Sequence, residues 1–581
     1  MRSAIGLSEK AMLAMVAAAA AARLASGVIP CAQCHPKEVA GFEATPMGRS
    51  LGVPPRVPAG KFNHDASGSR FTVEWDGAGM IQNVERGGVH AEYEISYAVG
   101  SGTHAFPYLT TIGGHLFESP LGYFPGRGWR MSPGYEHDAK PDFYRPVTPD
   151  CLFCHAGSTR PLPGAYNAYQ DPPFEAQAIT CERCHGPTEA HLRAPLPGSI
   201  VNPAKLAPRA RDSVCEQCHL IGEERVANPG KQLSDFRAGE NLEDVFAVYV
   251  SGASKNSESP AGLRVVSQVQ QLALSKCARR SEGKLWCGTC HDPHSGAAPA
   301  ATNFRARCRE CHGEALVKRH PKPSDDCVGC HMPRRPVTDG AHTIFTDHRI
   351  AIHASRELTA SSAAPANARG SKAPASLVAW HDPAGALAQC DLGLAEIKVG
   401  DRLESFDLVN QGFQLLMNCW DSFPADPALL TGLGKALLAA GHGPESAAAF
   451  EQAIQIEPNV AVRYLDAALA WKAAHDDRKA IGNLEKTIQL DPLLEQPYLE
   501  LASIYAAEHD PDMVRRTEER YLHAFPKSIR AQLAARDMSA GSRPDGKVSD
   551  SAWQAVEYQG AASQIHAPGH KDQDGGASAR N

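Results

Sequence analysis

The sequence has no excess of positive charge, and beyond residue 26 it has no long apolar run. With 58 Lys and Arg against 65 Asp and Glu, the formal net charge is -7. This balance argues against nucleic acid or an anionic membrane surface as the main partner. No run after the N-terminus reaches the roughly 18 apolar residues of a membrane-spanning helix. We therefore expect no nucleic acid partner and no integral membrane segment in the mature chain.

The first 26 residues have the features of an export signal. Arg2 and Lys10 supply positive charge, residues 12–22 are apolar, and the small residues at 20–22 and 24–26 offer cleavage sites. The alternative is an Ala-rich helical anchor. Export would place the mature protein in the periplasm or outside the cell, where disulfides form readily.

The cysteines follow a pattern that disulfides do not explain. Of the 17 cysteines, all but three fall into copies of Cys-x-x-Cys-His, with thiols at Cys31, Cys34, Cys151, Cys154, Cys181, Cys184, Cys215, Cys218, Cys287, Cys290, Cys308, Cys311, Cys327 and Cys330. The adjacent histidines are His35, His155, His185, His219, His291, His312 and His331. In this motif two thiols bind the vinyl groups of one haem, and the next imidazole binds the iron as proximal ligand.

Zinc knuckles or redox-active cysteine pairs are the alternative reading of these motifs. A zinc site does not require a histidine directly after every pair, and a redox site requires a single pair. The sequence therefore predicts seven covalently bound haem c groups.

A second axial ligand is needed for each six-coordinate haem. The candidate distal histidines are His64, His104, His191, His294, His320, His348 and His353. Each is alternatively an ordinary surface histidine. Met47 is a further candidate, and methionine ligation would raise the potential of that haem. Cys277, outside the motifs, is either a buried thiol or a group close to a haem.

The segments that separate the motifs are short and rich in Pro and Gly. They lack helical periodicity, so we expect the haems to supply most of the apolar filling there. Phe71–Trp75 and Tyr93–Tyr97 alternate in polarity and predict a small β element. The aromatic run from 100 to 135 is either the wall of a haem pocket or a structural insert.

A 34-residue period organises the C-terminal part of the chain. Prolines recur at positions 424, 458, 492 and 526, and small residues recur in register at Gly434, Ala468 and Ala502. This pattern is typical of tetratricopeptide repeats, in which small residues let two helices pack closely. A generic helical bundle is the alternative. Because such solenoids bind peptides or proteins, we expect the repeats to dock a redox partner protein. Cys390 and Cys419 are expected to be core residues.

These features divide the chain into five parts. They are a signal peptide (1–26), a seven-haem cytochrome c domain (28–353), a linker (354–380), tetratricopeptide repeats (393–528) and a disordered tail (529–581). The linker is rich in Ala and Ser, and the tail is poor in apolar residues. The expected fold is mainly α: a multihaem cytochrome c module with little regular secondary structure and a small β element, followed by a tetratricopeptide α-solenoid.

Residues 28–353 resemble the multihaem c-type cytochromes grouped with the tetrahaem electron carrier of ammonia oxidisers. The resemblance rests on Cys181–Pro187 with His191, on Cys287–His294 and on Cys327–Pro333. It implies that His191, His294 and His320 are distal ligands, often to a haem other than the neighbouring one. The whole chain is also similar to bacterial proteins that fuse such a module to tetratricopeptide repeats.

Three functions are compatible with this sequence. The first is electron transfer outside the cytoplasm, with the repeats docking a redox partner. The second is a haem-based oxidoreductase acting on a small nitrogen or sulfur compound, with the segment around His104, His115 and Arg130 as the pocket wall. Related nitrite reductases carry a Cys-x-x-Cys-Lys motif, which this chain lacks. The third is an assembly scaffold with structural haems.

Overall fold

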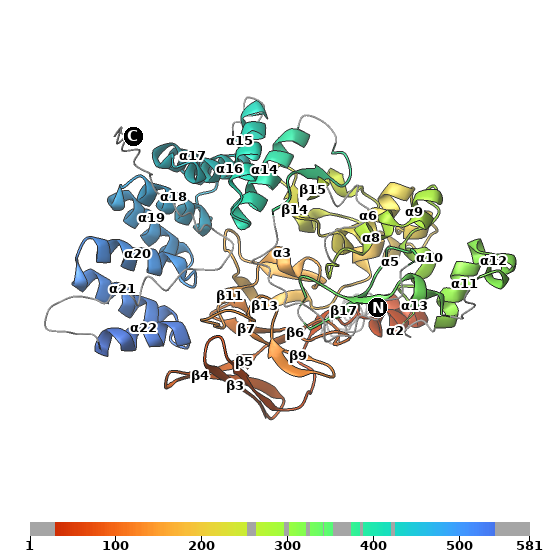
Figure 1. Cartoon of the computed structure of the whole chain (residues 1–581), viewed down its shortest axis with the longest axis horizontal. Coiled ribbons are helices and arrows are strands. Elements are labelled where there is room, and N and C mark those ends of the chain that lie inside the picture. The colour runs from red at the N-terminus through yellow and green to blue at the C-terminus, as the bar shows by residue number, and fades with distance from the viewer. Residues whose placement is uncertain are drawn as a thin grey trace, which may run out of the picture.

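In a computed structural model, the described residues are 30–252, 263–295, 301–320, 326–340, 342–352, 373–383, 387–419 and 425–540. A β-rich part, a part built of short helices and an arc of paired helices make up the molecule (Figure 1). The predicted signal peptide and His353 lie outside the described residues. None of the helices in these ranges combines the length and the apolar character needed to cross a membrane.

Antiparallel sheets dominate residues 51–146, where the sequence predicts a small β element. A four-stranded sheet runs in chain order, with strands β2 (Gly60–His64), β3 (Ser69–Asp76), β4 (Gly79–Arg86) and β5 (Val89–Ile95). A five-stranded sheet has the order β1 (Leu51–Gly52), β6 (Tyr97–Val99), β7 (Tyr108–Ile112), β8 (His115–Glu118) and β11 (Arg145–Pro146). Strands β9 (Leu121–Phe124) and β10 (Gly128–Met131) form a ribbon. The protein is thus mixed α and β rather than mainly α.

The two predicted strands are confirmed within these sheets. In β5, Val89, Ala91, Tyr93 and Ile95 are buried and the residues between them are exposed. The other strands escaped prediction because most have two to five residues, too few to show a period.

Residues 30–43 and 149–346 carry the cysteine motifs on short helices. The helices are α2 (Pro36–Glu43), α3 (Pro149–Leu152), α4 (Glu182–His185), α5 (Glu189–Arg193), α6 (Pro208–His219), α8 (Gln268–Leu274), α9 (Lys276–Arg280), α10 (Cys287–Cys290), α11 (Ala301–Cys311), α12 (Glu314–Lys318) and α13 (Cys327–His331), with 3-10 turns η1 (Pro30–Gln33), η2 (Pro203–Lys205), η3 (Leu233–Asp235) and η4 (Leu242–Asp244). Two ribbons accompany them, β12 (Ser158–Pro161) with β13 (Tyr169–Ala176) and β16 (Arg334–Pro336) with β17 (Ile344–Thr346).

This region has a side-chain core of its own, contrary to the expectation from its Pro and Gly content. Phe153, Leu220, Phe236 and Phe246 are buried together. Beside them, a three-stranded sheet places β15 (Phe246–Ser251) between β14 (Glu224–Ala227) and β18 (Leu377–Ala379). Strand β18 lies in the predicted linker, so that prediction was wrong for residues 377–379. Residues 354–372 of the linker lie outside the described part.

The C-terminal arc consists of paired helices. They are α14 (Leu387–Arg402), α15 (Phe406–Cys419), α16 (Pro427–Ala439), α17 (Gly443–Ile456), α18 (Ala461–Ala473), α19 (Asp477–Leu490), α20 (Gln496–Ala507), α21 (Pro511–Ala524) and α22 (Ile529–Ala540). Gly434, Ala468 and Ala502 are buried where helices cross. A Cβ on Gly434 would lie 2.7 Å from the Phe450 ring, which explains the small residue in this register.

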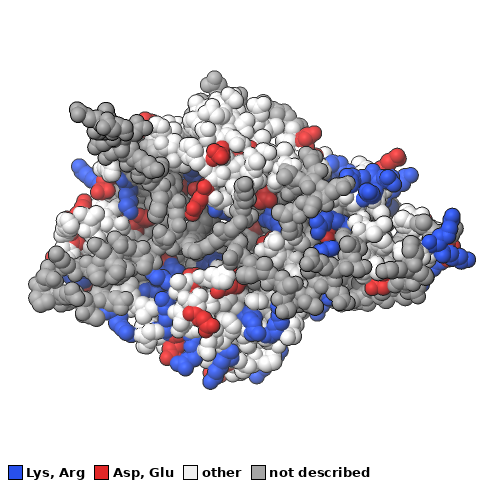
Figure 2. Space-filling view, in the orientation of Figure 1, with Lys and Arg blue, Asp and Glu red and all other residues white. Residues whose placement is uncertain are grey.

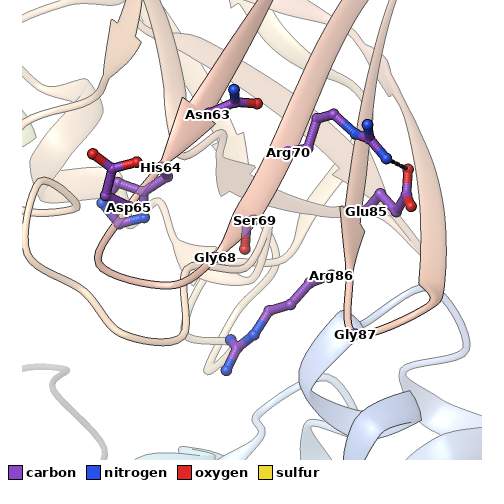
Figure 3. Close-up of a pocket in the computed structure, with 9 residues that line it drawn as sticks. All are labelled: Asn63, His64, Asp65, Gly68, Ser69, Arg70, Glu85, Arg86 and Gly87. Atoms are coloured by element: carbon purple, nitrogen blue, oxygen red, sulfur yellow. Dashed lines mark hydrogen bonds and ion pairs between the residues drawn. The ribbon is translucent and has the colours of Figure 1, made fainter.

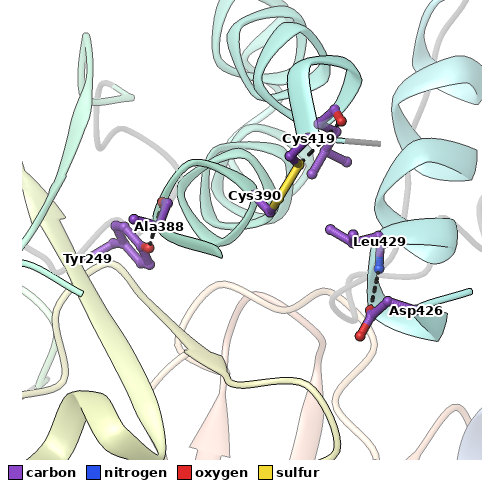
Figure 4. The surroundings of a disulfide bond; sticks show 7 residues. Tyr249, Ala388, Cys390, Cys419, Asp426 and Leu429 are labelled. Atoms are coloured by element: carbon purple, nitrogen blue, oxygen red, sulfur yellow. Dashed lines mark hydrogen bonds between the residues drawn. A yellow bond between two sulfur atoms is a disulfide. The ribbon is translucent and has the colours of Figure 1, made fainter. Parts of the chain in front are cut away.

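Two features of the arc differ from the prediction. Cys390 and Cys419 are buried as expected, but they are joined in a disulfide that links α14 to α15 (Figure 4). Residues 529–540, assigned to a disordered tail, form α22, in which Ile529 and Ala531 are buried against the sheets. The sequence signal was weak because the large apolar residues of this helix are limited to Ile529, Leu533 and Met538. Residues 541–581 lie outside the described part.

Equivalent loops of successive repeats contact the N-terminal half. The carbonyl of Asn459 lies against Gly164, the side chain of Leu493 against Gly113, and the carbonyl of Lys527 accepts a hydrogen bond from the Tyr93 hydroxyl. These three contact residues are 34 residues apart. The repeats therefore present one edge of the solenoid, unit after unit, to the rest of the chain (Figure 1).

Candidate haem-binding sites

Each motif forms a tight helical turn. The backbone amide of the motif histidine donates to the carbonyl of the first cysteine in His35, His185, His291 and His312, at 2.8–2.9 Å. Positions i, i+3 and i+4 of such a turn share one face. Both thiols and the imidazole of a motif therefore lie on the same side, as attachment to one flat macrocycle requires.

Four motif histidines have a second histidine opposite them. Ring centroids are 6.4 Å apart for His35 and His191, 5.9 Å for His185 and His294, 6.2 Å for His291 and His348, and 5.9 Å for His331 and His320. The ring planes are inclined by 23°, 28° and 30° in the first three pairs and by 82° in the fourth. Two imidazoles that bind one metal ion from opposite sides, with metal–nitrogen bonds of about 2 Å, have centroids about 6 Å apart. The pairs thus fit the two axial positions of a haem iron.

Hydrogen bonds fix the protonation of several of these rings. Nδ1 of His185 lies 2.7 Å from the Val201 carbonyl, Nδ1 of His331 2.9 Å from that of Ala351, and Nδ1 of His348 3.0 Å from that of Thr346. Because a carbonyl only accepts, Nδ1 must carry the proton, which leaves the Nε2 lone pair for a metal.

His191 is held in the same way by a side chain. Its Nδ1 lies 2.8 Å from Ser199 Oγ, and that hydroxyl donates to the Leu196 carbonyl at 2.7 Å. The serine oxygen therefore accepts from His191. Sequence reasoning missed all of these orienting groups, because most are backbone carbonyls and any residue supplies one.

Two of the predicted distal histidines are placed elsewhere. Both ring nitrogens of His64 are engaged, Nδ1 with Ser67 Oγ at 2.8 Å and Nε2 with the Glu136 carbonyl at 3.0 Å. His104 stacks on Phe345 with centroids 4.1 Å apart, and burial, with the charge of Arg334, lowers its pKa. Neither ring contacts a motif histidine within the described residues.

Three motif histidines, His155, His219 and His312, have no histidine ring opposite them in the part of the chain that the structure describes. Burial lowers the pKa of His155 and of His219, and the nearby His291 lowers the pKa of His219 further. A neutral imidazole is the form that binds a metal. These rings are therefore suited to a proximal role.

Cysteines of different motifs lie next to one another. Thiols interact in the pairs Cys31 with Cys181, Cys184 with Cys215, Cys154 with Cys218, Cys215 with Cys287, Cys290 with Cys308, and Cys308 with Cys327. These interactions link every motif to another in one branched series, in which the motif of Cys215 and Cys218 is next to three others. Cys277 in α9 lies near Cys290 and Cys308.

The arrangement fits haem better than zinc. Structural zinc takes four ligands, and no three His, Cys, Asp or Glu side chains of the described ranges converge on a metal-sized space. The histidines instead lie in pairs, and the two thiols of one motif are adjacent to each pair. The fourteen motif cysteines are free of disulfides in this structure.

The segment predicted as an alternative pocket wall does not converge on a site. His115 pairs with Asp491 of the solenoid, Nε2 to Oδ1 at 3.0 Å, and Arg130 donates to the Trp129 carbonyl. His191, rather than Met47, lies opposite His35.

A shallow pocket of about 390 Å³ lies at the turns between β2 and β3 and between β4 and β5 (Figure 3). Its lining includes His64, Ser69 and Arg86, and none of its residues belongs to a Cys-x-x-Cys-His motif. It is therefore not part of the candidate haem sites.

Comparison with known proteins supports a c-type cytochrome. Residues 133–186, which contain the motifs ending at His155 and His185, match the family described as "Cytochrome c554 and c-prime". The chain thus carries a cytochrome c554 family segment, which implies covalently attached c-type haem.

The other comparisons add little to this. A solved structure described as "Crystal structure of MamA" matches with 20% identity over 25% of this chain and 81% of that chain, at a TM-score of 0.23. A likeness at this TM-score supports no conclusion about the fold. No curated protein matches the chain.

Proposed function

We propose that this protein is a seven-haem c-type cytochrome that transfers electrons outside the cytoplasm. The observation that carries the proposal is the pairing of four motif histidines with histidines from other segments, at centroid distances of 5.9–6.4 Å. Each pair would give a six-coordinate, low-spin iron with no position open to substrate. When bound, haem supplies a one-electron couple at iron.

The residues of the chain perform three tasks in this function. The motif cysteines would tether each haem, and the proximity of thiols from different motifs would keep successive haems close together. Carbonyls such as those of Val201 and Thr346 hold the axial rings in the metal-binding tautomer. The cytochrome c554 family segment supports a location outside the cytoplasm, where c-type cytochromes work.

The repeats support this function through contacts with their own chain. Arg530 donates to Glu495 and to the Lys140 carbonyl, and Ser528 donates to Asp142. Arg402 pairs with Glu224 on β14 at 2.9 Å. The solenoid thus holds the cytochrome half at several points along its edge. Docking of a redox partner by the repeats stays a prediction.

A second function is favoured by the unpaired motif histidines. His155, His219 and His312 face no histidine ring within the described residues, and one of their haems with an open axial position would bind small ligands. The protein would then be an oxidoreductase acting on a small nitrogen or sulfur compound.

Low-temperature EPR of the ferric holoprotein, with optical spectra before and after addition of cyanide or nitrite, separates the two functions. Electron transfer alone predicts low-spin signals that do not respond to either ligand. A high-spin signal that shifts when either ligand is added would contradict electron transfer alone and favour the oxidoreductase.

A further inference from the structure

The charge of the chain is unevenly distributed around the motifs. Although the chain has net charge -7, residues 276–319 carry Lys276, Arg279, Arg280, Lys284, Arg305, Arg307, Arg309, Lys318 and Arg319 against Glu282, Asp292, Glu310 and Glu314. Figure 2 shows Lys and Arg gathered over α9 and at the end of the molecule formed by α11 and α12, whereas both signs mix elsewhere in this view.

We define the basic face as the exposed side chains of α9, the turn after it, α11 and the segment that ends α12. They are Lys276, Arg279, Arg280, Lys284, Arg307, Lys318 and Arg319. Among the described residues, the side chains of Lys276, Arg280, Lys284 and Lys318 form no hydrogen bond or ion pair. Within the face itself, Arg307 pairs with Glu310 and Arg279 donates to the Leu274 carbonyl. The basic face therefore keeps charge that the fold does not neutralise.

This face borders one end of the series of attachment points. The charge of Arg307 acts on the Cys290 thiol, and Cys277, between Lys276 and Arg279, lies near Cys290 and Cys308. Cys311 and His312 are exposed. A protein bound here would lie next to haem groups, which electron transfer requires.

The inter-repeat edge of the solenoid is not available for this task. Asn459, Leu493 and Lys527 already contact the N-terminal half, and Asp491 is bound to His115. The basic face is a different surface, and it combines exposure, charge and proximity to the motifs.

We propose that the basic face docks an acidic redox protein that exchanges electrons with the haems of the motifs ending at His291 and His312. This rests on the proposed electron-transfer function. Complementary charge at such a surface steers encounter and selects the partner. The partner would present carboxylates around its own redox centre.

The test measures binding of oxidised flavodoxin, a small acidic redox protein used as probe, to the holoprotein by titration calorimetry. At about 20 mM salt the Debye length is about 20 Å, so exposed charges act over the whole face. The double variant Arg280→Glu/Lys284→Glu should bind at least about tenfold more weakly than the unmodified protein. At about 300 mM salt this difference should largely disappear.

The matched control is Arg516→Glu/Lys231→Glu, which reverses an exposed Arg and an exposed Lys outside the basic face. It should change the dissociation constant less than about twofold. Equal weakening by both doubles, or by neither, would overturn the proposal. Phosphatidylglycerol vesicles are the second probe. If the protein binds these vesicles but not flavodoxin, and Arg280→Glu/Lys284→Glu abolishes vesicle binding, the proposal is overturned in favour of a membrane surface. Reduction by dithionite, recorded in parallel, reports on the electron-transfer function separately.

Discussion

The imidazole rings of His185 and His294 lie 5.9 Å apart, with planes inclined by 28°, although they belong to different motif segments. His185 is fixed through Nδ1 by the Val201 carbonyl. The pair places His294, from the segment after the fifth motif, opposite His185 of the third. A haem bound between them, as proposed, would tie together two segments that are far apart in the sequence.

Replacing His294 should open one axial position. In His294→Ala the haem held by His185 should change from low-spin to high-spin, because its iron loses one of two nitrogen ligands. EPR and the optical spectrum of the ferric holoprotein measure the change, and the mass should still include every haem. His90→Ala, on the exposed face of β5, is the control and should leave the spectra unchanged. An unchanged spin state in His294→Ala would refute the pairing.

The contact between His115 and Asp491 should couple the two halves of the chain. The side chains are 9% and 1% exposed, so His115→Ala leaves a buried carboxylate without its partner and should cost about 3 kcal/mol. Urea unfolding of the single and double variants gives the coupling energy, which should exceed about 1 kcal/mol.

The exposed pair Arg70 and Glu85, whose side chains are 57% and 47% exposed, is the control cycle. Its coupling should stay below about 1 kcal/mol. Similar coupling in both cycles would argue against a specific joint at His115.

Two helical glycines should respond in opposite directions to alanine. At Gly434 the new Cβ meets the Phe450 ring at 2.7 Å, so Gly434→Ala should destabilise the solenoid by about 1–3 kcal/mol. At Gly482, in α19, a Cβ meets nothing within 4 Å. Gly482→Ala should stabilise by about 0.5–1 kcal/mol, since alanine favours helix. Thermal unfolding followed by circular dichroism gives the midpoint temperature of each variant. Equal shifts of this temperature in both variants would contradict the close packing of α16 on α17.

The pH dependence of stability should include Asp391 of α14. Burial, and then the charge of Asp426, raise its pKa to about 7. Because the folded chain holds this proton more tightly than the unfolded chain, Asp391 contributes stability at low pH. That contribution is lost as pH rises from about 4 to about 7. Asp391→Asn should therefore gain stability relative to the parent over this window. If the difference in unfolding free energy between Asp391→Asn and the parent stays constant from pH 4 to pH 8, the pKa of Asp391 is not raised.

Local patterns predicted the attachment sites and the solenoid. The cysteines and proximal histidines sit within five residues of each other, and the 34-residue period places Gly434, Ala468 and Ala502 in one register. Which candidate distal histidine lies opposite which motif histidine depends on contacts between segments. His348 faces His291 because β17 and the residues after it return to α10. The ring of His64 instead contacts Ser67 in its own turn and the distant Glu136 carbonyl.

Tertiary contacts also explain the elements that the sequence did not predict. β18 exists because β15 offers it an edge, with Val250 opposite Val378. α22 is held by Ser528 and Arg530, which bond to Asp142 and Lys140 of the N-terminal half. Partners that are distant in the sequence produce no periodicity or distinctive composition in the segment itself. The sequence therefore predicted irregular structure for both segments.

The number of electrons that one chain accepts tests the central claim most directly. Coulometric titration of the purified holoprotein, followed by the haem absorbance, should count about seven one-electron equivalents per chain, one for each Cys-x-x-Cys-His motif. A chain that is isolated with zinc, or that takes up no electrons while its haem bands stay unchanged, would contradict the account.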